Sequence, residues 1–166
     1  MTEVLIRHIQ PHELQALLDL YQQLHVTDAP LPAKDILEQT WNEILTDPKL
    51  RYFVAEVEGQ LVASCTLAII PNLTRGARPY GVIENVVTHA SYRRRGIGTQ
   101  LLQQALQTAW SKNCYKVMLL TGSKQAATLH FYEQAGFQKG LKTGFVAAPD
   151  DALRLPNPQP PSDTHP

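Results

Sequence analysis

The sequence predicts a single mixed α/β (α+β) domain. Strand-like and helix-like segments follow one another in the order β-α-α-β-β-β-α-β-α-β, so helices interrupt the strands of one sheet. A chain of 166 residues is long enough for one domain with a sizeable core and short for two. We place the domain at residues 1–148. Residues 149–166 hold six of the 12 prolines and are expected to form a disordered tail.

The N-terminal third is expected to contain one strand and two helices. Thr2–Ile9 has strand character, and Pro11 suits the first turn of a helix that carries leucines at helical spacing up to Leu24. A second helix is predicted over Ala33–Leu45, whose apolar residues lie on one face. The segment between them, His25–Pro32, contains two prolines and is predicted to be a loop.

The middle of the chain is predicted to form three strands. Arg51–Val57 and Leu61–Ile70 form a hairpin, since the turn Glu58-Gly59-Gln60 supplies a glycine for a positive φ. A polar loop, Pro71–Pro79, leads to the third strand, Tyr80–Thr88.

The C-terminal part alternates helix and strand. Leucine and alanine residues recur every four positions in Gly96–Asn113, which predicts a helix, and Cys114–Leu120 is strand-like. A further helix, Lys124–Ala135, should end at Gly136, because glycine favours the position after a helix. Two short strands complete the prediction, Phe137–Gln138 and Thr143–Ala148.

Charge and apolar patterning exclude several functions. Fifteen basic and fifteen acidic residues cancel, so no overall field favours nucleic acid or an anionic membrane. The longest apolar run, Leu61–Ile70, is about half of what a bilayer requires. Charged residues interrupt Met1–Gln10, which is therefore not expected to be a signal peptide.

The two cysteines are expected to be small core residues. Cys65 and Cys114 each lie in an apolar, strand-like segment, and no Cys/His spacing matches a zinc site. A chain without a disulfide framework is typical of a reducing compartment, so we expect a cytoplasmic protein without a metal.

A loop between a strand and a helix is the strongest functional signal. Thr88 ends a strand, three arginines follow, and Gly96 and Gly98 open a helix. Unpaired N–H groups at a helix start bind anions, and glycines let a ligand approach the backbone closely. A P-loop is excluded because Thr99-Gln100 follows Gly98, and a dinucleotide fingerprint is excluded because Leu101 replaces its third glycine.

The loop, read as Arg-x-x-Gly-x-Gly, resembles the pyrophosphate loop of the GNAT superfamily of acetyl-CoA-dependent N-acetyltransferases. A second segment, FYEQAGF at Phe131–Phe137, resembles the family's motif on the helix after the next strand. Ile83-Glu84 and Asn113–Lys116 look closest to the glucosamine 6-phosphate N-acetyltransferase branch.

The resemblance implies a mostly antiparallel sheet, flanked by helices, in which one strand pair splays apart to bind CoA. The pantetheine arm would lie beside Val86, Val87 and Thr88, with an N–H of Val86 or Val87 facing the thioester oxygen. The pyrophosphate would lie on the loop, although the sequence does not select the arginine that contacts it. The implied loop residues are Arg93, Arg94, Arg95, Gly96, Ile97, Gly98 and Thr99.

Two catalytic residues are implied. Tyr132 would donate a hydrogen bond or a proton to the leaving sulfur, and Glu84 would accept the amine proton directly or through water. His89 and His130 are alternative bases, and Glu84 has the alternative of an ordinary surface glutamate. Many family members have Asn where this chain has Gln125, so a side-chain contact from that position is in doubt.

The expected function is therefore transfer of the acetyl group of acetyl-CoA to a primary amine of a small molecule or peptide, by direct attack in a ternary complex. The alternative is a non-catalytic acyl-CoA-binding sensor or scaffold. The arginine run also allows a nucleic-acid contact, which zero net charge and the lack of interleaved aromatic residues argue against. The acceptor amine and the oligomeric state stay open, with a homodimer as one option.

Overall fold

The computed structural model describes residues 3–25 and 28–149, and it confirms the predicted mixed α/β domain. Five strands lie side by side in chain order in an open sheet. Neighbouring strands are antiparallel except for the last pair, which is parallel. The strands are β1 (Leu5–His8), β2 (Leu50–Val57), β3 (Gln60–Ile70), β4 (Tyr80–Thr88) and β5 (Val117–Leu119).

The helices fall close to their predicted positions. Pro11 begins a 3-10 turn that leads into α1, as expected for a proline in a first turn. The loop predicted between β3 and β4 contains one short helical turn, α3. The helical elements are η1 (Pro11–Glu13), α1 (Leu14–Tyr21), α2 (Lys34–Thr46), α3 (Thr74–Ala77), η2 (Ala90–Tyr92), α4 (Ile97–Ser111) and α5 (Ala126–Gln134).

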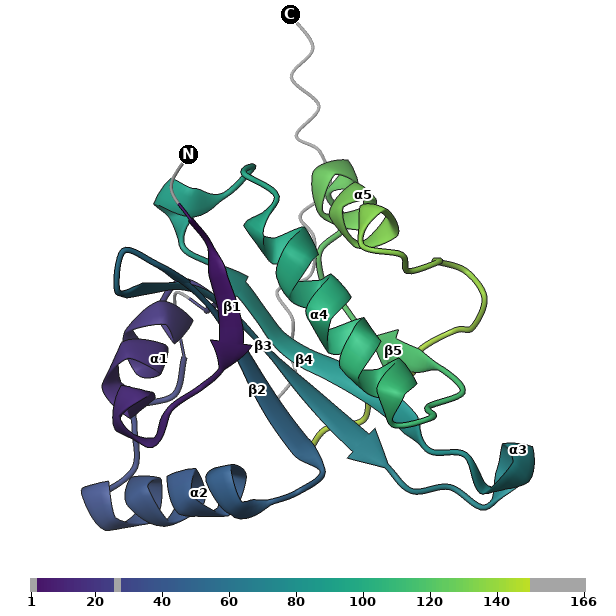
Figure 1. Ribbon diagram of the computed structural model, residues 1–166, viewed down its shortest axis with the longest axis horizontal. Coiled ribbons are helices and arrows are strands. Elements are labelled where there is room, and N and C mark those ends of the chain that lie inside the picture. The colour runs from purple at the N-terminus through teal and green to yellow at the C-terminus, as the bar shows by residue number, and fades with distance from the viewer. Residues whose placement is uncertain (1–2, 26–27, 150–166) are drawn as a thin grey trace, which may run out of the picture.

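The sheet separates two hydrophobic layers, and Figure 1 shows α4 running across one of its faces. Leu101, Leu102 and Ala105 of α4 are fully buried against the strands on that face. On the other face, Leu17 of α1 and Trp41 of α2 form a smaller core with β2 and β3. Burial of these apolar faces stabilises the sheet and fixes the end of β4 relative to the start of α4.

An ion-pair network fixes the edge strand β1. The Arg7 guanidinium donates to Glu13 and to Glu56, and the shortest N···O distance to each carboxylate is 2.6 Å. Glu13 is nearly buried, and the hydrogen bonds from Arg7 hold the pKa of its carboxyl below the usual value. The network therefore joins β1 to β2 and to the start of α1.

The prediction of two late strands was wrong for the chain up to residue 149. Residues 137–149 contain no strand, and β5 ends at Leu119. Phe145 is 91% exposed, so this segment has no apolar face packed against the core, which a strand here would need. The predicted tail, residues 149–166, lies outside the described residues except for Pro149, as does Thr2 at the start of the first predicted strand.

Candidate active site

A cleft of about 580 Å³ opens where the ends of β4 and the starts of α4 and α5 meet. Its walls are the last residues of β4, the loop that enters α4, one side of α5 and the segment after α1. Figure 1 shows where these elements lie in the fold. The cleft is lined by Gln23, Leu24, Val86, Val87, Thr88, Tyr92, Arg93, Arg94, Gly96, Ile97, Gly98, Thr99, Gln125, Ala127, Thr128, His130, Phe131, Tyr132 and Gln134.

A β-bulge redirects β4 at this point. Asn85 has a left-handed backbone with φ 52°, and the pairing with β3 shifts so that Thr66 faces Glu84 but Ser64 faces Val87. One extra residue in β4 bends and twists the strand. The pairing of β4 with β5 ends at Ile83, so residues 84–88 have no strand beside them on the β5 side. Backbone polar groups of this segment are thereby available to a ligand that binds as an added strand.

The loop that leads into α4 has the geometry of an anion site. Gly96 is the residue before the helix and has φ 76°, a left-handed conformation that glycine adopts without strain. The first intrahelical bond runs from the N–H of Gln100 to the carbonyl of Gly96, at 3.0 Å. The N–H groups of residues 97–99 precede it and have no acceptor within the helix, so they form the positive end of α4.

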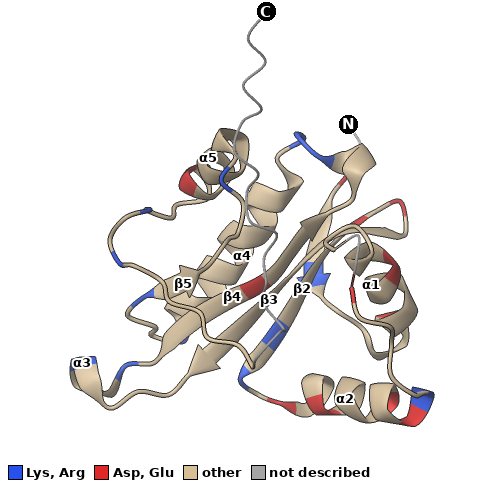
Figure 2. Cartoon of the chain, turned by 180° about the vertical axis from the view of Figure 1, so that it is seen from behind, with Lys and Arg blue, Asp and Glu red and all other residues tan. Residues whose placement is uncertain are grey.

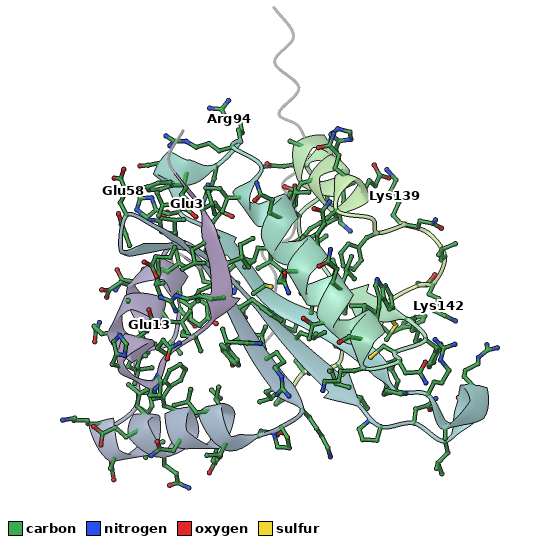
Figure 3. The ribbon with its side chains drawn as sticks, in the orientation of Figure 1. Glu3, Glu13, Glu58, Arg94, Lys139 and Lys142 are labelled. Atoms are coloured by element: carbon green, nitrogen blue, oxygen red, sulfur yellow. The ribbon has the colours of Figure 1, made fainter. Side chains whose placement is uncertain are left out.

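The three arginines differ in their contacts. Arg93 donates to the carbonyl of Thr88 at 2.9 Å and so holds the loop against the end of β4. Arg95 lies over the ring of Tyr92, with 5.1 Å between the guanidinium carbon and the ring centre. Arg94 lines the cleft, is exposed, and makes no hydrogen bond or ion pair with the other described residues; Figure 3 shows it at the tip of the loop. Arg94 is therefore the arginine best placed to reach an incoming phosphate.

Gly98 also serves the packing of α4. It is buried, and a Cβ added there would lie 3.1 Å from the ring of Phe131 and 3.1 Å from the hydroxyl oxygen of Thr88. Gly98 also lines the cleft, so close packing is a second reason for a glycine here beside the predicted approach of a ligand. A larger residue at Gly98 would push α4 away from α5 and from β4, because these contacts are already tight.

Tyr132 is a half-buried phenol in the wall of the cleft. Its ring packs between Phe131, with ring centres 4.9 Å apart, and Phe137, at 6.4 Å. Burial raises the pKa of Tyr132, and the negative charge of Glu84 raises it further. At neutral pH the side chain is therefore a protonated hydrogen-bond donor with Glu84 close enough to influence it.

Glu84 is exposed and does not line the cleft. Its neighbour Ile83 packs into the core beside α4, so Glu84 points to the opposite face of the sheet. The structure thus places Glu84 outside the cleft that Tyr132 lines, at the start of the segment that β5 leaves unpaired.

The two histidines that compete with Glu84 have different environments. His89 accepts the N–H of Ser91 at Nδ1 and packs edge-on against Tyr92, so its side chain is already used in the turn after β4. His130 is exposed on α5 and lines the cleft.

Gln23 and Leu24 were missed by the sequence reasoning. Gln23 accepts the N–H of Ala90 at 2.7 Å and so joins the segment after α1 to the loop that enters α4. No motif marks these residues, because they are more than sixty positions from the rest of the site in sequence.

The described residues contain no group of three or more His, Cys, Asp or Glu side chains arranged to hold a metal ion. No helix in residues 3–25 or 28–149 is both long enough and apolar enough to cross a membrane.

Comparison with known proteins identifies the family. The model of the acetyltransferase (GNAT) family matches residues 14–137. The chain belongs to the GNAT acetyltransferases. This match confirms the family that the Arg93–Gly98 loop and the FYEQAGF segment indicated.

The GNAT relatives include proteins of similar length. A glucosamine 6-phosphate N-acetyltransferase of Trypanosoma brucei brucei is 33% identical over 142 residues, which are 83% of this chain and 93% of the relative. A solved structure from Agrobacterium tumefaciens, itself only provisionally described as an acetyltransferase, is 45% identical, with a TM-score of 0.81 over 87% of this chain and 99% of that one. A Clostridium acetobutylicum structure that contains acetyl-CoA shares the fold, with a TM-score of 0.69 at 20% identity over 87% of this chain and 96% of that one.

Proposed function

We propose that this GNAT protein transfers the acetyl group of acetyl-CoA to a primary amine of a small molecule or peptide, by direct attack within a ternary complex. The observation that carries the proposal is the unpaired end of β4 between an anion-binding helix start and the phenol of Tyr132. Membership of the family and the activity named for the trypanosomal relative support the same reaction.

The cleft fits the two ends of acetyl-CoA. The pyrophosphate oxygens would accept hydrogen bonds from the N–H groups at the start of α4 and from the guanidinium of Arg94. A helix N-terminus and a guanidinium both favour phosphate. The pantetheine arm would run along residues 86–88 as an added strand. The thioester oxygen would then accept an N–H of Val86 or Val87, which stabilises the negative charge of the tetrahedral intermediate.

Acetyl transfer needs one proton acceptor and one hydrogen-bond donor. The neutral amine attacks the thioester carbon, a C–N bond forms, and the C–S bond breaks when the intermediate collapses. Glu84 would take the proton that the amine loses, directly or through water. Tyr132 would donate to the departing sulfur. A phenol pKa of about 10 against about 8.5 for a thiol favours a donated hydrogen bond over full proton transfer.

Replacing Arg94 by alanine is expected to raise the dissociation constant of acetyl-CoA roughly tenfold, because one charge-assisted contact to phosphate is lost. The effect should shrink at high salt. Titration calorimetry at two salt concentrations measures the dissociation constant of acetyl-CoA and its salt dependence. Arg95→Ala is the matched control, because Arg95 is held over Tyr92. The Arg95→Ala variant should bind acetyl-CoA about as tightly as the wild type. A larger loss for Arg95→Ala than for Arg94→Ala would reverse this assignment.

The experiment that tests the function follows acetyl-CoA and a panel of amines together. An acetyltransferase releases one free CoA thiol for each N-acetylated product that mass spectrometry detects. Tight binding of acetyl-CoA without turnover on a panel of sugar, alkyl and peptide amines would instead favour a sensor or scaffold.

A further inference from the structure

One face of the sheet carries no helix of the described residues over β4 and β5. Ile83, Val117 and Leu119 pack toward the core beneath α4. Side chains alternate along a strand, and the register pairs Val82 with Met118, so these two residues point to the opposite face together with Glu84. Leu120 continues the alternation along the chain that leaves β5. We refer to Val82, Glu84, Met118 and Leu120 as the acceptor face.

No helix within residues 3–25 or 28–149 covers the acceptor face. The smaller core formed by α1 and α2 involves β2 and β3, and the view in Figure 2 shows no helix in front of β4 and β5. Glu84 is exposed and Leu120 is 58% exposed. Part of the coil after α5 passes in front of β5 and β4 on this side (Figure 2), and a Cβ at Gly144 would lie 2.8 Å from a methyl carbon of Leu120. The acceptor face is therefore apolar, bordered by coil, and marked by a single carboxylate.

A positive charge lies at the far end of the same face. Tyr80 is two residues before Val82 on β4 and so shares its face, and the Lys116 ammonium lies 5.4 Å from the centre of the Tyr80 ring. It lies equally far from the ring of Tyr115. No carboxylate of the described residues is within ion-pair distance of Lys116, and the sequence from Asn85 to Tyr132 has no acidic residue.

The separation of the two charges sets the size of a ligand that contacts both. Tyr80 and Glu84 are four residues apart on one strand, which corresponds to roughly 13 Å at about 3.3 Å per residue. An extended peptide advances by a similar amount per residue, so three to four residues bridge the two charges. A single phosphorylated amino sugar is shorter than this backbone separation, so it would contact both charges only with the side chains of Glu84 and Lys116 extended toward each other.

We propose that the acceptor is a short linear peptide of three to four residues with small apolar side chains and a free carboxylate. Its N-terminal amine lies at Glu84, its side chains contact Val82 and Met118, and its carboxylate pairs with Lys116. This inference rests on the proposed acetyl transfer and adds the substrate class. Charge complementarity at both ends and apolar surface between them support this occupant.

The test compares the tetrapeptide Val-Ala-Val-Ala with its C-terminal amide as acceptors at saturating acetyl-CoA. The wild-type kcat/KM is expected to be about tenfold higher for the free acid, mainly through KM, because the ion pair is made in the ground state and the transition state alike. In Lys116→Met the preference for the acid should disappear, and in Lys116→Arg it should persist. Lys112→Met, an exposed lysine just after α4, is the matched control and should keep the wild-type preference.

Three outcomes would overturn the inference. Equal kcat/KM for the free acid and the amide in the wild type would show that the peptide carboxylate makes no ion pair with Lys116. A higher kcat/KM for glucosamine 6-phosphate than for every peptide would reject the peptide class while acetyl transfer itself stands. Binding of acetyl-CoA with no amine acetylated would reject the proposed function and the substrate class together.

Discussion

Replacing Tyr132 by phenylalanine is expected to lower kcat by on the order of tenfold to a thousandfold, with acetyl-CoA affinity nearly unchanged. The reason is that the hydroxyl acts on sulfur only as the C–S bond breaks, whereas the ring keeps its packing between Phe131 and Phe137. Burial and the charge of Glu84 raise the pKa of Tyr132, so the wild-type hydroxyl is a donor throughout the neutral range. Steady-state kinetics with a calorimetric dissociation constant separates the two effects.

Tyr92→Phe is the matched control for this substitution, because Tyr92 also lines the cleft and this account gives its hydroxyl no role. Its kcat should stay near the wild-type value. If Tyr132→Phe changed only KM, Tyr132 would be a binding residue and the sulfur would leave without its help.

Replacing Glu84 by glutamine is expected to lower kcat/KM most near neutral pH and least as the pH approaches the pKa of the acceptor amine. Glutamine keeps the size of the side chain but accepts no proton, and a base is least needed when the amine is already neutral. The comparison with wild type is essential, because deprotonation of the free amine produces a similar acidic limb in both enzymes. A complete pH profile of kcat/KM for both enzymes measures this difference.

Glu133→Gln serves as the control for the loss of one carboxylate near the cleft, since Glu133 is exposed on α5 and paired with Lys139 at 3.0 Å. Its pH profile should match that of wild type. A wild-type rate and profile in Glu84→Gln would remove Glu84 from the mechanism and leave His130, which lines the cleft, as the first alternative.

The parts of the site that were predictable are those that local sequence controls. A strand end followed by Arg-x-x-Gly-x-Gly predicted the start of α4 and its unpaired N–H groups, because these groups and the left-handed φ of Gly96 are local properties. The FYEQAGF segment likewise predicted α5 and its Tyr132, since helical spacing and the glycine after the helix are local signals.

Properties that depend on the three-dimensional path of the chain were not predictable. Three consecutive arginines look equivalent in sequence, and only the conformation of the loop, which brings Arg93 to Thr88 and Arg95 over Tyr92, distinguishes them from Arg94. The packing role of Gly98 depends on Phe131, which lies more than thirty residues further along the chain. Thr143–Ala148 was predicted to be a strand, but a strand also needs a neighbour to pair with, and β5 itself pairs over only three residues.

The central claim is that acetyl-CoA binds along the unpaired end of β4 with its sulfur beside Tyr132, and a crystal structure with bound CoA tests it most directly. The account predicts that the pyrophosphate lies on the N–H groups of residues 97–99 and within reach of Arg94. It also predicts that the CoA sulfur lies about 3 to 4 Å from the Tyr132 oxygen, the range of a hydrogen bond to sulfur. A CoA molecule bound elsewhere, or with its sulfur directed away from Tyr132 toward α1, would contradict the account.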